Sequence, residues 1–247
     1  MPFDTTAHKV RKVFDEAAPF YDRMNDWMSL GLHHAWKDAL VTSLPWSDLR
    51  KKPHALTFLD MAGGTGDITK RLAERCQDLH RAPKLLLADI NTAMLEVSQK
   101  RHPEAPWAHL HEDATRLSLK TSTVDVYTIA FGLRNVSNLK HALQETFRVL
   151  KPGGSFHCLE FSAPRTPIMH TLFRLYLHTW IPLCAVSIAD RVSPYTYLRK
   201  SILAFPQPCL LAQMMEKVGF EHVTHRPLSG GVVALHTAIK PLKTRRT

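Results

Sequence analysis

The sequence predicts an α/β fold: a doubly wound, mostly parallel sheet of seven strands that ends in an antiparallel hairpin. Strand-like and helix-like patterns alternate between residues 57 and 161, a glycine-rich turn follows the first strand, and two strand-like runs close the chain around a short glycine loop. At 247 residues, the chain is most simply a single domain over 1–247.

Helices are expected before the first strand. Val10, Val13, Phe14 and Ala17 have the i, i+3, i+4, i+7 spacing of an amphipathic helix over 6–18. Two further short helices are expected within 22–44. Together these helices would form an N-terminal cap over residues 1–52.

The run over 57–67 predicts a buried strand, a tight glycine turn and the start of a helix, and the next strand covers 85–89. Glycines such as Gly64 and Gly66 let the backbone approach a ligand closely, and Asp89 at the end of the second strand can accept hydrogen bonds from both ribose hydroxyls. The adenosine of S-adenosylmethionine fits better than a dinucleotide, because Thr69 stands where G-x-G-x-x-G needs a glycine. A purely structural turn is the alternative.

Later segments continue the alternation and then interrupt it. Lys151-Pro152-Gly153-Gly154 is typical of a helix C-cap followed by a tight turn into a strand. The remaining elements are expected in this order: a helix from 92 to about 100, a strand over 108–112 that ends at Asp113 and Ala114, a strand over 124–131, a helix over 138–150, a strand over 155–161, a helical insert over 163–205, a helix over 207–219, and an antiparallel pair over 221–226 and 232–239.

A formal charge of +10 and a pI near 9.6 indicate a polyanionic partner or simply a basic surface. The cations cluster without interleaved aromatic residues or a base-reading motif, so no nucleic acid is expected. An anionic membrane surface remains a candidate partner.

Several features indicate a cytoplasmic protein. The four cysteines lie far apart without a C-x-x-C pair, which is typical of a reducing compartment. The N-terminus has no apolar core and contains acidic residues, so neither a signal nor a transit peptide is expected. The apolar region over 168–189 is interrupted by His170, Arg174 and His178 and is not expected to span a membrane.

Two long segments carry a resemblance to a known family. Residues 21–36 (YDRMNDWMSLGLHHAW) and 148–162 (RVLKPGGSFHCLEFS) resemble the two signature patterns of the ubiquinone/menaquinone biosynthesis C-methyltransferases, and 131–136 and 231–236 are similar to that family too. The resemblance spans nearly the whole chain. It implies the Rossmann-like fold of class I S-adenosylmethionine-dependent methyltransferases and methylation of a ring carbon of a polyprenylated benzoquinol or naphthoquinol.

The resemblance also implies the cofactor site. It assigns Thr65, Asp89 and the pair Asp113-Ala114 to S-adenosylmethionine, with Gly64 and Gly66 lining the turn. Asp113 would accept from the adenine amino group while the next backbone N–H donates to a ring nitrogen. The turn has Ala62 where methyltransferases commonly have glycine, although alanine is normal in this family. The chain departs from the usual residues of the family at His34, Lys200 and Ala130.

Ring methylation needs a group that stabilises a phenolate and a group that accepts a proton. Arg134 is the candidate for the first role, with a structural ion pair as the alternative. His33 is the candidate proton acceptor, since an imidazole titrates near neutral pH. Tyr21, Asn25 and Asn135 are expected to contact the substrate.

No metal is expected at the site. His109 and His111 alternate with Asp113 and could ligate an ion on one face of a strand, but an activated ring needs no metal and adenine is expected at that strand end.

A polyprenyl substrate predicts contact with an anionic membrane at its inner face or delivery within a quinone-biosynthesis assembly. The insert carries Met169, Phe173, Tyr176, Leu177 and Trp180 on one side, a face expected to meet the bilayer or else to pack on the sheet. Three alternatives stay open: the ubiquinone or the menaquinone precursor as substrate, methylation of another lipid or small phenol, and a noncatalytic nucleoside-binding component of a complex.

Overall fold

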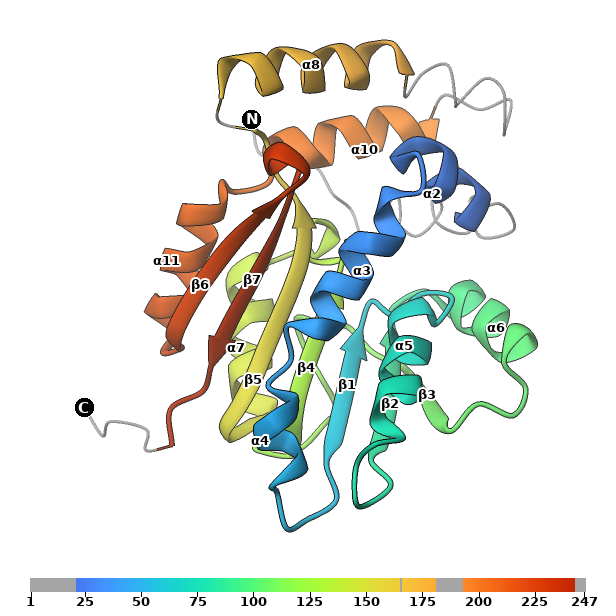
Figure 1. The fold of residues 1–247 in the computed structure, drawn as a ribbon, viewed down its shortest axis with the longest axis vertical. Helices are drawn as coiled ribbons and strands as arrows, with labels where there is room; N and C mark the ends of the chain where they lie inside the picture. Colours follow the sequence, from blue (N-terminus) through green and yellow to red (C-terminus); the bar gives the residue numbers. More distant parts are fainter. Residues whose placement is uncertain (1–20, 165, 181–192, 243–247) are drawn as a thin grey trace.

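The computed structural model describes residues 21–164, 166–180 and 193–242 (Figure 1). The helix predicted over 6–18 lies outside these residues. Figure 1 shows the sheet at the centre with α8 and α10 above the ends of its strands.

The sheet has seven strands in the order β3-β2-β1-β4-β5-β7-β6. The first five of these are parallel neighbours, and β7 pairs antiparallel with both β5 and β6. The bounds are β1 Thr57–Met61, β2 Lys84–Asp89, β3 Trp107–His111, β4 Val124–Ala130, β5 Leu150–Phe161, β6 Glu221–Leu228 and β7 Val233–Ile239. The predicted doubly wound sheet with a terminal antiparallel pair is confirmed.

Helices precede, connect and cap the strands. Asn91 and Asn138 begin two of them with side-chain oxygens that accept from Met94 N at 3.1 Å and His141 N at 3.0 Å. The described helices are α2 Tyr21–Ser29, α3 Leu32–Thr42, α4 Trp46–Arg50, α5 Asp67–Cys76, α6 Thr92–Arg101, η2 Leu133–Asn135, α7 Leu139–Val149, α8 Pro167–His178, α10 Ser193–Ala204, α11 Pro208–Val218 and η3 Ser229–Gly231.

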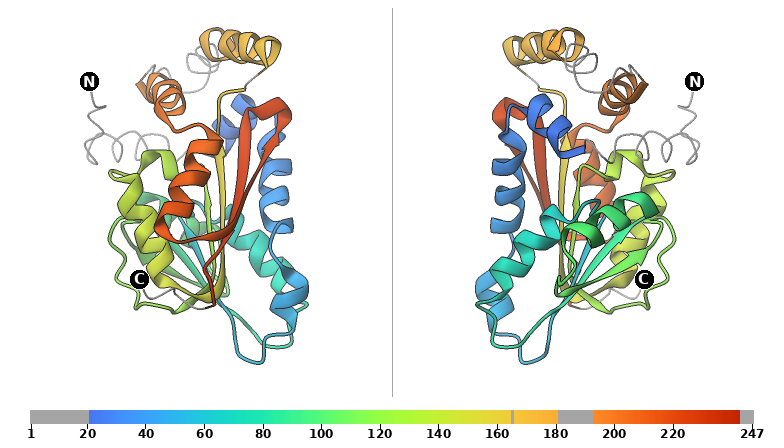
Figure 2. Two further views of the ribbon diagram at one scale, coloured as in Figure 1. Left: turned by 90° about the vertical axis from the view of Figure 1, so that its left-hand side faces the viewer. Right: turned by 90° about the vertical axis from the view of Figure 1, so that its right-hand side faces the viewer.

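Both faces of the sheet are covered, as Figure 2 shows, with α3, α4 and α5 on one side and α7 and α11 on the other. The central strands are therefore buried on both faces and consist mostly of apolar residues. Phe58 of β1 packs with Leu40 and Leu72 on the first side. Its neighbour Leu59 belongs to the core on the other side, with Leu143.

The glycine turn predicted after α7 is wrong. The strand β5 begins at Leu150, directly after α7, and residues 151–154 lie within it. The register between β4 and β5 shifts there, since Val124 pairs with Leu150 and Val126 with Ser155. Gly153 adopts a φ of 74°, and its N–H donates to Lys240 O at 2.8 Å. The Pro-Gly-Gly sequence therefore bends a continuous strand, because the end of β7 supplies the hydrogen bonds that an isolated turn would lack.

The predicted insert contains α8 and α10, which pack against α2. Their shared core is formed by Met28, Phe173, Leu177, Leu198 and Ile202. Of the two interpretations of this face of α8, contact with the bilayer is wrong, because the face packs inside the protein, with Phe173 4% and Leu177 2% exposed. Within the described chain, no helix is long and apolar enough to cross a bilayer.

Candidate active site

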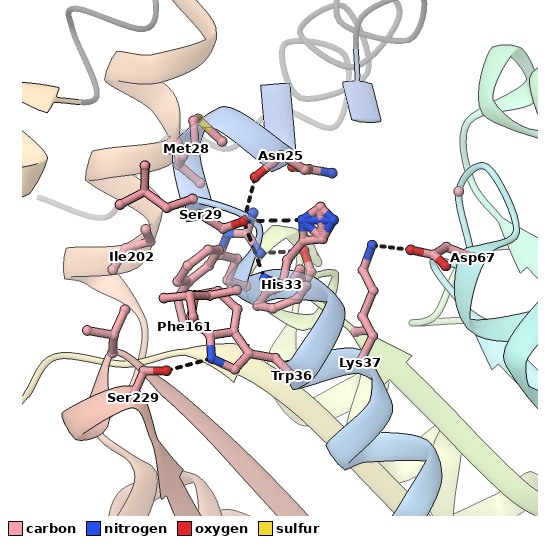
Figure 3. Close-up of a pocket in the computed structure, with 18 of the residues that line it drawn as sticks. Asn25, Met28, Ser29, His33, Trp36, Lys37, Asp67, Phe161, Ile202 and Ser229 are labelled. Atoms are coloured by element: carbon pink, nitrogen blue, oxygen red, sulfur yellow. Dashed lines mark hydrogen bonds and ion pairs between the residues drawn. The ribbon is translucent and has the colours of Figure 1, made fainter. Parts of the chain in front are cut away.

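A cavity of about 520 Å³ lies where β1, β4 and β5 end, beneath α2, α8 and α10 (Figure 3). Its lining is polar beside the turn after β1 and apolar between the helices. In an open α/β sheet, ligands bind at the carboxyl ends of the strands, where the strand order reverses. Here that point lies between β1 and β4.

The turn after β1 has the backbone of a ligand cradle. Gly64 adopts a φ of 54°, and a Cβ placed there would meet no atom within 4 Å, so its open side faces free space. Gly66 has a φ of 94°, and a Cβ there would lie 2.8 Å from Ser98 Oγ. Ala62 is also left-handed, at 53°, which explains why glycine is common at this position in related turns.

Gly132 and Ala62 are in close contact across the turn. A Cβ on Gly132 would lie 2.3 Å from Ala62 Cβ, whereas its next contacts, with Ile129, are ordinary. We expect Gly132→Ala to lower the free energy of unfolding by about 1–3 kcal/mol in urea denaturation, through overpacking. Adding Ala62→Gly removes the opposing methyl and should restore most of this loss. Equal stability of Gly132→Ala and the wild type would contradict the prediction and show that the backbone of the turn shifts to accommodate the added methyl group.

Asp89 is fixed by the same turn. Its Oδ2 accepts from Gly64 N at 2.9 Å and its Oδ1 from Asn91 N at 2.8 Å. Burial raises the pKa of this carboxyl, and the hydrogen bonds from Asn91 and Gly64 oppose that shift. The two amides hold the carboxylate in place while each oxygen keeps a lone pair for a ribose hydroxyl.

Asp113 and Ala114 follow the neighbouring strand end, since β3 pairs with β2 and Glu112 N donates to Asp89 O at 3.1 Å. Asp113 Oδ1 accepts from the N–H and the hydroxyl of Thr115, both at 2.8 Å. Ala114 is buried. Thr65 and Gly64 line the cavity, whereas Gly66, Asp89, Asp113 and Ala114 are not among its lining residues.

Asp60, the residue before the last of β1, is a cavity residue that the sequence did not reveal. Its carboxylate is buried and accepts from Thr69 Oγ1 at 2.7 Å and Thr128 Oγ1 at 2.9 Å. Burial raises its pKa to about 7. The sequence pattern that could have indicated this residue is a single acid within an otherwise apolar strand.

Arg134 lies in η2 and lines the cavity. Its Nη1 is 2.7 Å from Glu160 Oε1, and its backbone N–H donates to Glu160 Oε2 at 3.1 Å. The guanidinium also contacts Phe131 O and lies 5.3 Å from the centre of the Phe161 ring. The ion pair foreseen as the alternative is present, yet the buried Nε has no hydrogen-bond partner among the described residues. One donor is thus left for a ligand.

His33 projects from α3 into the cavity, as Figure 3 shows. Its Nδ1 is 3.2 Å from Ser29 Oγ and its Nε2 is 3.3 Å from Asp26 Oδ1. Burial, together with the positive charge of Lys37, lowers its pKa to about 4. The ring is therefore neutral at neutral pH and can receive a proton, but it is a weak base.

His34 shares the same carboxylate, with its Nε2 3.0 Å from Asp26 Oδ1. Asp26, His33 and His34 are the described group whose ligand atoms lie close enough to hold a metal ion. In the structure, His34 Nε2 is hydrogen-bonded to Asp26 Oδ1 and His33 Nε2 lies 3.3 Å from the same oxygen, which accounts for the grouping. This group lies on α2 and α3, whereas His109 and His111, the metal ligands considered from the sequence, lie on β3.

The residues expected to contact the substrate are placed differently. Asn25 lines the cavity, and its backbone carbonyl accepts from Ser29 Oγ at 2.6 Å. Asn135 does not line it, and its Oδ1 accepts from Tyr197 OH at 2.9 Å. Tyr197 does line the cavity and was missed. The side chain of Tyr21 lies outside the described residues.

Comparison with known proteins identifies the family of this chain. Residues 3–240 match the model of the ubiE/COQ5 methyltransferase family. The chain belongs to this family. The match covers nearly the whole chain, including the strands whose ends line the cavity.

Individual relatives agree with the family match. The chain is 43% identical over 244 residues to the ubiquinone/menaquinone biosynthesis C-methyltransferase UbiE of Methylobacterium nodulans, covering 97% of this chain and 94% of that protein. It is 40% identical over 250 residues to the mitochondrial 2-methoxy-6-polyprenyl-1,4-benzoquinol methylase of Oryza sativa subsp. japonica, covering 94% and 83%. A solved S-adenosylmethionine-dependent methyltransferase from Thermotoga maritima superposes with a TM-score of 0.61 at 17% identity, covering 93% and 98%. The protein is a methyltransferase with the class I fold.

Proposed function

We propose that this protein transfers a methyl group from S-adenosylmethionine to a ring carbon of a polyprenylated benzoquinol or naphthoquinol, in ubiquinone or menaquinone biosynthesis. The observation that carries the proposal is a single cavity with the glycine turn and Arg134 at its polar end and an apolar end between helices. The names of the relatives from Methylobacterium nodulans and Oryza sativa support the substrate class.

S-adenosylmethionine, when bound, supplies a methyl group on a positively charged sulfur. The residues of the turn fit it, because Gly64 leaves open space and the buried Asp89 holds two acceptor oxygens in a fixed position. Thr65 would lie along the ribose and the methionine part, and Asp113 with Ala114 would take the adenine edge. Asp60 would place a carboxylate near the positive charge.

The apolar end of the cavity suits the prenyl tail. It is lined by Met28, Leu172, Phe173, Leu177 and Ile202 from three helices. In this proposal the cap over 1–52 and the insert over 163–205 cover the substrate, all within one domain over 1–247. Leu32 and Leu172 line the cavity and are 46% and 54% exposed, so they lie at its opening.

Arg134 would stabilise the phenolate that makes the ring carbon nucleophilic. Its charge is held by Glu160, and its buried Nε is the donor left for the oxygen. The proton that the ring carbon sheds would pass to His33 directly or through water, with Asp26 beside the imidazole stabilising its charged form. Asn25 would contact the ring at the cavity wall.

A substrate panel tests this function. The purified protein should methylate short-tailed prenyl benzoquinols or naphthoquinols, kept reduced, at a ring carbon, as judged by mass spectrometry and NMR of the product. Unprenylated phenols should react far more slowly, because they leave the apolar end empty. Reaction only with other phenols or lipids would favour the alternative methyltransferase, and cofactor binding without any product would favour a noncatalytic component.

The proposal includes a cytoplasmic protein in transient contact with an anionic membrane, or with a partner of a quinone-biosynthesis assembly. Support comes from a second stripe on α8, formed by Ile168, Leu172 and Leu175, which are 75%, 54% and 58% exposed at helical spacing. This stripe includes a residue of the cavity opening. The net charge of +10 would assist attraction to anionic lipid.

Exposed apolar residues on α8 should matter for membrane binding. We expect the paired change Ile168→Ser and Leu175→Ser to weaken binding to anionic vesicles about tenfold or more, because two leucine-sized side chains no longer enter the lipid. Cosedimentation at low and high salt measures this, and added salt should also weaken binding. Leu210→Ser is the control, because it makes the same substitution at an exposed leucine of α11. Unchanged binding of the paired variant would remove the stripe from the proposal.

A further inference from the structure

Lys37 is a buried ammonium at the polar end of the cavity. It extends from α3, its side chain is 11% exposed, and it lines the same cavity as Gly63 and Thr65. Figure 3 shows it reaching from α3 toward Asp67 at the start of α5. Its Nζ is 2.6 Å from Asp67 Oδ2.

The charges around Lys37 leave room for another carboxylate. An ammonium has three N–H donors, and Asp67 is its carboxylate partner among the described residues. Asp67 is shared, since Arg71 Nε also donates to its Oδ1 at 3.1 Å. Arg71 has a second acid, Asp38, beside it. Lys37 has no second acid in the described chain, although burying a cation without enough acceptors is costly.

The positive charge of Lys37 also reaches the cavity. It is one of the causes, after burial, that lower the pKa of His33, whose ring faces the same space. For Asp67, burial acts to raise the pKa, but Lys37 and Arg71 outweigh it and the pKa lies below its ordinary value. An ionised Asp67 and a charged Lys37 thus stand together at the cavity wall.

We propose that Lys37 binds the α-carboxylate of the methionine part of S-adenosylmethionine. The amino-acid end of this ligand carries one carboxylate and one ammonium. Lys37 matches the first, and the acids Asp60 and Asp67, which line the same cavity, match the second. The inference rests on the proposed cofactor and adds the subsite that holds its zwitterionic end, beyond the residues assigned to the adenosine.

A structural role for Lys37, tying α3 to α5 through Asp67, predicts a different outcome. Two ligands separate the roles: S-adenosylhomocysteine, and its decarboxylated analogue, which lacks only the carboxylate. Lys37→Met should weaken binding of S-adenosylhomocysteine about 10–100-fold in calorimetry and leave the analogue within about twofold of its wild-type affinity. Lys37→Arg should keep most of the difference between the ligands.

Arg71→Met is the matched control, because it removes the other cation on Asp67 without touching the cavity lining. It should change the affinities of the two ligands by the same factor. Equal loss of both ligands in Lys37→Met, or no loss of either, would overturn the carboxylate subsite. If Lys37→Met does not fold, equal binding of both ligands to the wild-type protein would overturn the subsite as well. Failure of S-adenosylhomocysteine to bind the wild type would instead refute the proposed cofactor.

Discussion

Arg134→Lys is expected to lower the turnover number on the order of 100-fold while the affinity for S-adenosylmethionine stays within a factor of about two. Lysine keeps the charge opposite Glu160 but loses the planar fork. In the structure that fork contacts Glu160 and Phe131 O and leaves Nε for a ligand, and the compact ammonium of lysine cannot point its donors in the directions that the planar guanidinium covers. Removing a single donor to a developing oxyanion typically costs 100-fold to 1000-fold.

Measurement must separate this loss from damage to the buried ion pair. Glu160 is 1% exposed as a side chain, and breaking such a pair destabilises a protein by about 3–5 kcal/mol. Single-turnover rates with the variant saturated by S-adenosylmethionine report the chemical step on folded protein, and a urea titration reports stability. A loss of stability with a normal single-turnover rate would return Arg134 to a purely structural role.

The sheet could be predicted because its signals are local. An apolar run such as 57–61 must be buried on both faces, and the alternation with amphipathic helices leaves a parallel, doubly wound sheet as the simplest arrangement. The resemblance to the methyltransferase family then assigned a cofactor and a reaction to particular positions along these elements. The prediction failed at the segment 151–154, because the N–H of Gly153 donates to the carbonyl of Lys240, a residue that no local pattern could supply.

The apolar face of α8 shows a related limit. Its sequence has two apolar stripes, and a helical pattern cannot tell which one faces the protein. The sequence left two interpretations of the stripe with the aromatic residues, contact with the membrane or packing on the sheet, and in the structure Phe173 packs with Met28 and Ile202. Residues from α2 and α10, distant in sequence, decide the orientation.

Site residues divide in the same way. Gly64, Thr65 and Asp89 belong to one compact strand-turn-helix-strand unit, so the sequence alone pointed to them, and the structure places Gly64 N against Asp89. The buried charges depend on partners far along the chain, as with Lys37 and Asp67 or Arg134 and Glu160. Such pairs are visible only when the fold brings their elements together.

Asp89→Ala is expected to weaken binding of S-adenosylhomocysteine on the order of 100-fold, about 3 kcal/mol, because two ribose hydroxyls lose charge-assisted acceptors. The effect should be specific for those hydroxyls. Wild-type protein should prefer S-adenosylhomocysteine over its 2′,3′-dideoxy analogue, and Asp89→Ala should remove most of that preference. Calorimetry with both ligands measures it.

The control for this prediction is the neighbouring acid. Asp113→Ala should weaken both ligands and keep the preference for the hydroxyls, because the adenine edge is the same in each. Asp89→Ala also leaves the amides of Gly64 and Asn91 without their acceptor, so the turn can shift and lower affinity for both ligands by an equal factor. A preference that survives in Asp89→Ala would mean that the carboxylate only holds the turn. Its loss would mean that the same oxygens fix the backbone and bind the ribose, which joins the fold of this turn directly to its function.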